Sequence, residues 1–387
     1  MDKESDGVVV IHQSLAVNDR TGFCHVARKV GPSVFERIRH LKIGQKMQDL
    51  PEHLWHDSFK YYLKVDPDRK GGPNLRMIRL DPAHPSLTVT GFIFNKFVHP
   101  WEDRFVTPRE AARLQDLPDD FRFSGPLTSV QRQVGNAVPV NLARAIARSI
   151  FGHAKAHNTL RNFPDQTKLP SLSLFSGIGA FDLGFSCGMN REQGMGFLPM
   201  TAVESDPDCC ETMALNGFES LSPTDICQIS DPKAFWLQKS GRSDIALVVG
   251  GPPCQAFSQA GKQKGTSDER GQLIFQFIRF VGALRPVYFV MENVANLQGV
   301  EGGRLYRRIL QEFDLAGYRV NVGKLSATDF GTAQRRVRLI FLGVQKPWSL
   351  VDMPGPTHGC GEGDLFSALE PVKTVEQAFR GLPRLCA

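Results

Sequence analysis

The sequence lacks the features that mark several common classes of protein. Its eight cysteines form no C-x-x-C pair and no H-E-x-x-H motif is present, so we expect neither a metal site nor a disulfide framework. No apolar run approaches ~18 residues, so we expect no transmembrane helix. The first residues are polar and acidic, which is unlike a signal peptide, and the cysteine usage suits a reducing cytoplasm.

What is present fits a globular chain of two domains. A chain of 387 residues can bury a substantial core, and 41% hydrophobic and 22% charged residues are ordinary proportions for such a protein. The formal net charge of +6 permits a polyanionic partner such as a nucleic acid but does not require one.

Apolar and amphipathic segments alternate through the second half of the chain. Six strands are predicted, at 171–175, 201–204, 245–249, 286–291, 319–325 and 337–343. Helices are predicted between them, for instance at 207–216 and 271–284. This alternation predicts an α/β fold with a parallel, doubly wound sheet of the Rossmann-like type.

Helices are also predicted in the segment that precedes these strands. Thr107 has the features of an N-cap, Pro108 suits the first turn, and Glu110 completes a capping box. Another helix is predicted from about 140 to 150. The polar stretch that follows, 151–169, shows no clean period and is predicted to be a linker.

A thiol stands where one of the predicted strands ends. Residues 245–249 are apolar, and two glycines and two prolines lead from them to Cys254. Ligands of α/β sheets bind at the carboxyl ends of the strands, and the prolines fix the direction of the chain. Cys254 is therefore a candidate nucleophile. The alternative is a small buried thiol, which is the commonest setting of a free cysteine.

Another group of residues suits a nucleoside. Gly177 and Gly179 form a turn that lets a ligand approach the backbone closely, but Asp182 replaces the third glycine of a dinucleotide fingerprint. Glu204 ends the next strand and can bind both ribose hydroxyls, and Asp225 can meet an adenine amino group. Together they favour a nucleoside cofactor without a diphosphate, such as S-adenosylmethionine. Taken singly, Glu204 could equally be a solvated acid.

Charged residues end two further strands. Glu292 and Asn293 follow an apolar run, and a carboxyl group in such a place can hold a proton and deliver it. Arg336 and Arg338 are predicted on one face of a strand, which suggests a fixed site for an anion or a carbonyl group. Each of these residues could instead be exposed and purely structural.

Taken together, the motifs resemble those of the DNA (cytosine-5) methyltransferases. The matching stretches are 107–115, 133–139, 175–179, 252–255, 292–294 and 334–338. The family usually begins with the glycine turn and closes with the helix that here contains Asn136, whereas this chain has its closing elements first. Read from 170 to 387 and then from 1 to 150, the family order returns. The resemblance therefore indicates a circular permutation, which is tolerated where chain ends lie close together.

The resemblance implies a division of the chain. Residues 170–345 would be a catalytic domain that binds S-adenosylmethionine. Residues 1–103 and 346–387 would both belong to a smaller target-recognition domain. Residues 104–150 would be permuted closing motifs that dock on the catalytic domain, with 151–169 as a linker.

The resemblance also implies an activity. A methyl group would pass from S-adenosylmethionine to C5 of a cytosine that is flipped out of duplex DNA. Cys254 would attack C6 of the ring, Glu292 would hold and protonate N3, and Arg338 would contact the base beside Arg336. The stretch from Pro252 to about residue 267 would close over the flipped base.

Further site residues follow from the same matches. The cofactor pocket would be formed by Phe175, Gly177, Gly179, Glu204, Asp225, Ile226, Pro253, Asn136 and Val138. The DNA or the flipped base would be bound by Gln255, Ser258, Asn293 and Gln334. Two positions depart from the family: Ser205 stands where a bulky residue is frequent, and Val337 where a charged one is common.

The implied partner is double-stranded DNA, with a cognate restriction endonuclease acting independently. The protein itself would be a monomer in the bacterial cytoplasm, where it would serve restriction–modification. Three alternatives compete with this prediction. They are a transfer-RNA cytosine-5 methyltransferase of the same fold, a non-catalytic DNA-binding protein, and a nicotinamide oxidoreductase, which the missing third glycine opposes.

Overall fold

The structure, a computed structural model, describes residues 24–57, 59–61, 77–91, 96–187, 196–218, 221–253, 272–359 and 369–385. Its α-helices are α1 (Pro32–His40), α3 (Pro108–Arg113), α4 (Leu127–Asn136), α5 (Val140–His157), α6 (Ala180–Cys187), α7 (Pro207–Leu215), α8 (Pro232–Ser240), α9 (Gln272–Leu284), α10 (Arg304–Leu315) and α11 (Val375–Phe379). Its strands are β1 (Ile78–Arg79), β2 (Ser86–Leu87), β3 (Phe97–Val98), β4 (Leu169–Leu174), β5 (Phe197–Val203), β6 (Leu247–Gly250), β7 (Tyr288–Val294), β8 (Tyr318–Ser326), β9 (Gln334–Arg335), β10 (Val337–Gln345), β11 (His358–Gly359) and β12 (Glu370–Pro371).

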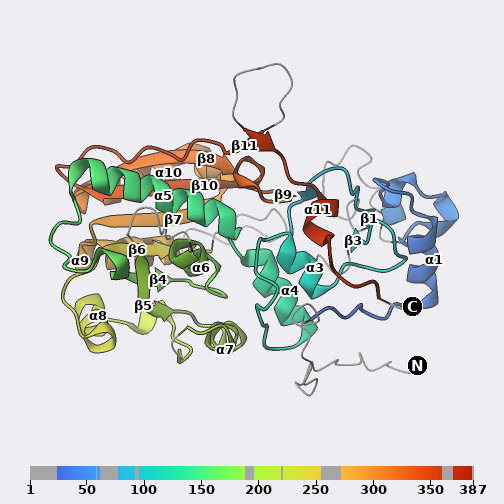
Figure 1. Cartoon of the computed structure of the whole chain (residues 1–387), viewed down its shortest axis with the longest axis horizontal. Helices are drawn as coiled ribbons and strands as arrows, with labels where there is room; N and C mark the ends of the chain where they lie inside the picture. Colours follow the sequence, from blue (N-terminus) through green and yellow to red (C-terminus); the bar gives the residue numbers. More distant parts are fainter. Residues whose placement is uncertain are drawn as a thin grey trace.

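Six strands form the central sheet, in the order β5-β4-β6-β7-β10-β8 (Figure 1). Strand β4 pairs in parallel with β5 and β6, and β6 pairs in parallel with β7. Strand β10 is antiparallel to both of its neighbours, β7 and β8. The six predicted strands are therefore confirmed, but the prediction of a wholly parallel sheet is wrong. The chain between β8 and β10 is too short for a crossover, so β10 returns in the opposite direction.

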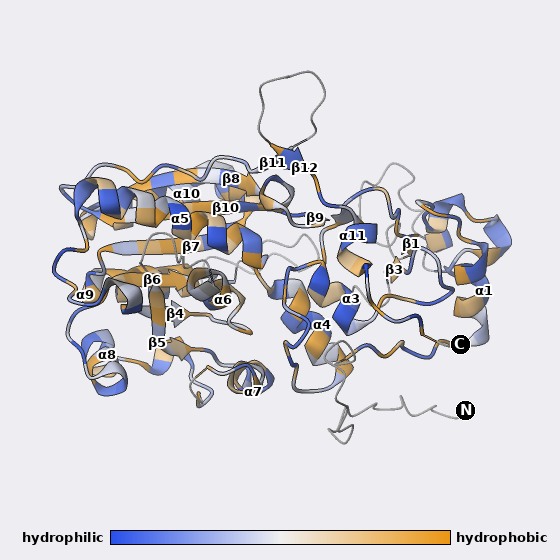
Figure 2. Ribbon diagram, in the orientation of Figure 1, coloured by the Kyte–Doolittle hydropathy of each residue, from blue (hydrophilic) through white to orange (hydrophobic). Residues whose placement is uncertain are grey.

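Side chains of each strand alternate between two helical layers. In β7, Tyr288 and Val290 pack in the cluster that contains α5 and α6. Phe289 and Met291 pack in the cluster that contains α9 and α10. The inner strands β4 and β6 are buried along their whole length, so they are mainly apolar, and orange predominates in the middle of the sheet in Figure 2. The sheet is thus covered on both faces.

Helix α5 belongs to the layer that covers one face of the sheet. It continues to His157 and ends at Asn158, whose φ of 53° gives a left-handed C-cap. Phe151 and Ala154 are buried in its last turns, and His153 Nδ1 lies 2.8 Å from the Tyr288 hydroxyl. The prediction that 151–169 is a linker is therefore wrong for residues 151–157, which continue α5. The helix was not predicted this far because polar residues on its exposed face interrupt the apolar ones, although Phe151 and Ala154 continue the buried face.

A smaller core lies beside the sheet, around α1, β1 and β3 (Figure 1). Its buried apolar residues are Ile38, Leu41, Met47, Leu50, Phe59, Met77, Val98 and Phe105. Arg79, only 5% exposed, crosses this core and donates hydrogen bonds to the carbonyl oxygens of Ile38 and Leu41. Arg79 thereby supplies hydrogen-bond partners for backbone carbonyls that are buried in this core.

The two ends of the described chain lie side by side. The His25 ring, at its Nε2, is 2.9 Å from the carbonyl oxygen of Pro383. The Arg113 guanidinium in α3 donates to the carbonyl oxygens of Ala378 and Arg380, which place α11 against α3 (Figure 1). The C-terminal segment therefore completes a part of the molecule that the N-terminal segment builds.

Gly135 allows the closest approach between α4 and the segment at residues 89–91. A Cβ atom at Gly135 would overlap the backbone of Thr90 and Gly91. Neither neighbour is a flexible side chain that could move aside, so a substitution has to shift the helix.

We therefore expect Gly135→Ala to destabilise the protein by about 1–3 kcal/mol, the usual cost of overpacking. Gly152→Ala is the matched control, because Gly152 lies inside α5 and a Cβ added there would meet no atom within 4 Å. Alanine favours a helix over glycine by about 1 kcal/mol, so this control should be neutral or stabilising. Urea unfolding of both variants measures the difference, and equal stabilities would contradict the close approach.

Candidate active site

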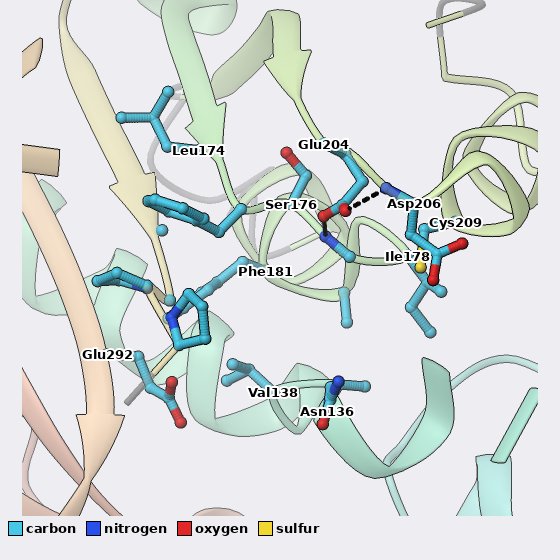
Figure 3. Close-up of a pocket in the computed structure, with 18 of the residues that line it drawn as sticks. Asn136, Val138, Leu174, Ser176, Ile178, Phe181, Glu204, Asp206, Cys209 and Glu292 are labelled. Carbon is cyan, nitrogen blue, oxygen red and sulfur yellow. Dashed lines mark hydrogen bonds between the residues drawn. The ribbon is translucent and has the colours of Figure 1, made fainter. Parts of the chain in front are cut away.

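A cavity of about 1060 Å³ opens at the carboxyl ends of the parallel strands (Figure 3). This edge is where open α/β sheets bind ligands. Its volume is at the upper limit of ~300–1,000 Å³ for one small-molecule site. The predicted site residues that line it are Asn136, Val138, Phe175, Gly177, Glu204, Asp225, Ile226, Pro253, Glu292, Asn293, Arg336 and Arg338.

Glu204 is held at the end of β5 by backbone amides. Its Oε2 accepts a hydrogen bond of 2.7 Å from the Gly177 amide, and its Oε1 accepts from the amides of Ser205 and Asp206 (Figure 3). These bonds fix the carboxylate at the rim of the glycine turn. Oε1 already accepts two hydrogen bonds and Oε2 only one, so Oε2 keeps acceptor capacity for a ligand hydroxyl.

The turn that follows β4 depends on positive φ angles. Gly177 has φ of 54° and Gly179 has φ of 75°, values that favour glycine. Phe175 also has φ of 53°, which is uncommon for a bulky residue and marks a constrained turn. Gly179 does not line the cavity itself; a Cβ there would crowd the ring of Phe218. Its contribution is to the shape of the turn.

Asp182 lies behind this turn, completely enclosed. The Ser173 hydroxyl donates a hydrogen bond of 2.8 Å to its carboxyl group. Burial raises the pKa of Asp182 to about 6, and the bond from Ser173 opposes that rise. Asp182 therefore replaces a glycine by adding a polar contact inside the fold, away from the cavity.

Residues far apart in the sequence meet around the cavity. Asn136 and Val138 lie at the junction of α4 and α5 and form the wall opposite Glu204 (Figure 3). Val134 and Ala137 pack in one apolar cluster with Ile178. The stretch at 133–139 therefore lies against the glycine turn, which is the contact that the cyclic order of the motifs requires.

Glu292 and Arg338 form an ion pair at the other end of the cavity. Arg338 Nε lies 2.6 Å from Glu292 Oε1, and both side chains are nearly buried, at 14% and 13% exposed. Their strands are neighbours, since Arg338 in β10 pairs in register with Val294 in β7. Gly251 leaves room for the pair, because a Cβ there would stand 3.1 Å from Glu292 Oε2. The carboxyl group is thus oriented toward the cavity.

Arg336 is buried, and its hydrogen bonds hold separate segments of the chain together. It precedes β10 and is 2% exposed, and its Nη1 donates to the carbonyl oxygens of Val89 and Gly135, both at 3.0 Å. Burial and the neighbouring charge of Arg338 lower the pKa of Arg336 to about 9, while Glu292 opposes this. The residue lines the cavity but its hydrogen bonds join three segments of the chain.

Gln334, which is predicted to contact DNA, lies inside the fold in this structure. Gln334 is completely buried, and its amide group bonds to Val89, Leu114 and Gln115. Asn293 is 2% exposed, and it bonds to the carbonyl oxygen of Pro252 and to the next amide in its own strand. Both amides are used within the fold, so these residues position the site.

Three of the expected site residues, Cys254, Gln255 and Ser258, lie outside the described residues, as does the stretch expected to close over the base. The chain is described up to Pro253, which lines the cavity together with Pro252. The carbonyl oxygen of Pro252 accepts a hydrogen bond from the side chain of Asn293, which lies near the end of β7. The direction in which the chain leaves β6 is thereby fixed.

Sequence reasoning missed two charged residues of this cavity. Arg132 in α4 and Asp206, the N-cap of α7, both line it. Arg132 lies four residues before Asn136, and this helical spacing was the signal that could have revealed it. Within the described ranges, no group of His, Cys, Asp and Glu side chains could hold a metal ion, and no helix is long and apolar enough to span a membrane.

A layered α/β fold with a cavity at the carboxyl edge of its sheet places the chain in the Rossmann-like class of folds, which bind nucleotides and related ligands at that edge. A family model described as C-5 cytosine-specific DNA methylase matches residues 30–152 and 169–369, which is most of the chain. The chain therefore belongs to the C-5 cytosine-specific DNA methylases.

Individual relatives are similar over about half of this chain. Type II methyltransferase M.AquIA of Picosynechococcus sp. is 38% identical over 226 residues, covering 55% of this chain and 88% of that protein. Type II methyltransferase M1.HphI of Haemophilus parahaemolyticus is 36% identical, covering 49% of each. A solved structure from E. coli, described as a DNA modification methyltransferase encoded within a prophage, is 30% identical and covers 56% of both chains with a TM-score of 0.43. The chain thus spans about half the length of M1.HphI.

Asp182 gives a testable dependence of stability on pH. Its pKa is about 6 in the folded protein against an ordinary value of 3.8, so the folded protein binds this proton more tightly than the unfolded chain does. Ionising the buried group therefore costs stability as pH rises from about 4 to 6, and the full cost remains above that range. Asp182→Asn keeps an acceptor for Ser173 and should raise Tm more at pH 8 than at pH 5.

Asp119→Asn serves as a control with the opposite sign. The hydrogen bond from Arg113 lowers the pKa of Asp119, which is ionised at both pH values. Asp119→Asn removes the carboxylate that pairs with Arg113, so it should lower Tm to a similar extent at pH 8 and pH 5. Thermal unfolding at the two pH values measures both variants, and an Asp182→Asn effect that does not change with pH would contradict the buried ionisation.

Proposed function

We propose that this protein transfers a methyl group from S-adenosylmethionine to C5 of a cytosine in duplex DNA. The observation that carries the proposal is one cavity with two different ends. Glu204 and the glycine turn stand at one end, suited to a ribose, and the Glu292–Arg338 pair stands at the other. A cavity with room for a cofactor and a base is what such a transfer needs.

The residues at the Glu204 end suit the nucleoside part of the cofactor. Glu204 would accept from the ribose hydroxyls, and Phe175 and Ile226 offer apolar surfaces for the adenine. Asp225 is held by the amide of Cys227 and would accept from the adenine amino group. Pro253, Asn136 and Val138 would close the pocket. When bound, S-adenosylmethionine supplies an electrophilic methyl group on its sulfonium.

The chain's own residues would activate the cytosine. The thiolate of Cys254 adds to C6 and forms a sulfur–carbon bond, while Glu292 gives a proton to N3. Electron density then collects at C5, which takes the methyl group. Loss of the C5 proton and cleavage of the sulfur–carbon bond restore the aromatic ring. Arg338 keeps the Glu292 carboxyl oriented throughout.

The target base has to leave the DNA stack to reach this cavity. Gln255 and Ser258, next to the nucleophile in sequence, are proposed to contact the flipped nucleotide. The smaller core around α1, together with α11, is proposed to recognise the DNA sequence. The net charge of +6 would favour the DNA backbone.

We further propose that the chain is a circular permutant of the usual family order. Support comes from α4 and α5, which complete the cavity and one layer of the sheet from an N-terminal position. The contact between His25 and Pro383 brings the two ends of the described chain together, as a permutation requires. The natural setting of such an enzyme is a bacterial restriction–modification system, where a separate endonuclease acts on the same DNA sequence.

The first test is methylation with labelled S-adenosylmethionine on duplex DNA and, separately, on transfer RNA. Label in DNA alone is expected. Cys254→Ala should abolish transfer, and Glu292→Gln should slow it by about 10²–10⁴-fold, since general acid catalysis contributes that much. Cys210→Ala is the matched control, because burial and Glu204 raise the pKa of Cys210 to about 11 and leave it an inert thiol.

Transfer to DNA that survives Cys254→Ala would contradict the covalent route. Label found in transfer RNA instead would favour the alternative substrate. A duplex with 5-fluorocytosine gives a second readout, since its C5 substituent cannot leave as a proton. The wild type should form a denaturant-stable adduct with this DNA, and Cys254→Ala should not.

A re-permuted chain tests the order of the segments. The chain would be opened after Asn158, the C-cap of α5, and residues 385 and 24 would be joined by a short Gly/Ser linker. Because the ends of the described chain lie together, the new chain should fold and keep methylation within about tenfold of wild type. A chain opened inside α5, after Ala147, is the control and should not fold. Failure of both chains would count against the permutation.

A further inference from the structure

Asp206 stands at the end of the cavity away from Glu292 (Figure 3). Arg132 also lines the cavity and lies beside Asp206. Arg132 Nη2 lies 3.7 Å from Asp206 Oδ2, and the two side chains are 63% and 32% exposed. Asp206 is fixed, since its Oδ1 accepts from the amide of Asp208 at the start of α7. The pair therefore joins α4, from the N-terminal part, to a helix of the sheet domain. Nothing in the proposed chemistry uses it.

Arg132 differs from the other arginines of the cavity. Arg336 is buried and donates to two carbonyl oxygens, and Arg338 pairs with Glu292 at 2.6 Å. Arg132 has a looser partner, because 3.7 Å is beyond a hydrogen bond. Among the described residues that line the cavity there is no lysine or histidine. An anionic group bound at this end would therefore meet Arg132.

S-adenosylmethionine carries such a group. Its amino-acid tail ends in a carboxylate and an ammonium group, which have to be placed once the ribose is at Glu204 and the methyl group faces Glu292. A guanidinium and a carboxylate held side by side match both charges of that tail. Arg132 also shares a face of α4 with Asn136, which lines the same cavity.

We propose that Arg132 binds the carboxylate of the cofactor's amino-acid tail, with Asp206 facing its ammonium group. This inference rests on the proposed function, because it names residues for the same cofactor. It also gives the N-terminal part a direct role in binding, because Arg132 belongs to α4.

Two ligands separate this role from a structural one. S-adenosylhomocysteine has the complete tail, whereas 5′-methylthioadenosine has the same nucleoside and thioether without it. Arg132→Met should weaken the Kd for S-adenosylhomocysteine by about 10–100-fold, which is typical for a charge-assisted hydrogen bond. The Kd for 5′-methylthioadenosine should change less than about twofold. Isothermal titration calorimetry measures both, and Arg132→Lys should recover part of the loss.

Arg148→Met is the matched control, because Arg148 is exposed on α5 and does not line the cavity. It should leave both affinities unchanged. Equal weakening of both ligands by Arg132→Met would overturn the inference and indicate a structural role, and so would an unchanged affinity for S-adenosylhomocysteine. If the wild type binds neither ligand, the proposed function itself fails, and the two failures are thereby distinguished.

Discussion

The N-terminal helices dock onto the sheet through apolar packing, and a small set of buried hydrogen bonds around Arg336 fixes the position of α4. One nitrogen of this side chain bonds to the carbonyl oxygens of Val89 and Gly135, and the completely buried Gln334 bonds to Val89 and Gln115. Buried charges and amides are tolerated only when they are paired, so these bonds leave little freedom for the parts that they join. The cavity exists because this docking brings α4 to the carboxyl edge of the sheet.

The same arrangement would allow the site to be assembled from the proposed permuted order of segments. Glu204 and the glycine turn need only β4 and β5, and the Glu292–Arg338 pair needs only β7 and β10. The wall between them comes from Asn136 and Val138, which precede all of these strands in the sequence. Packing decides which residues meet, and it does so regardless of where the chain is cut, provided that the ends lie together.

Much of the fold could be predicted from the chain. All six central strands were predicted from runs of apolar residues, and the capping box of Thr107 and Glu110 marked the start of α3. The antiparallel direction of β10 was missed, because a strand's direction depends on its connection and pairing rather than on its composition. The end of α5 was missed because polar residues on its outer face hid the buried stripe of Phe151 and Ala154.

The sequence by itself determined the local chemistry of this protein: which strands end in a carboxylate or an arginine, where glycine permits a positive φ, and which family the motifs resemble. Only the tertiary structure decided how these groups are used. It placed Gln334 and Asn293, both predicted to contact DNA, at buried positions where they bond to the backbone, and it placed Arg336 where its hydrogen bonds join separate segments. It also set Arg132 beside Asp206, which are 74 positions apart in the chain. Motifs depend on neighbours along the chain, whereas burial and charge pairing depend on neighbours in space.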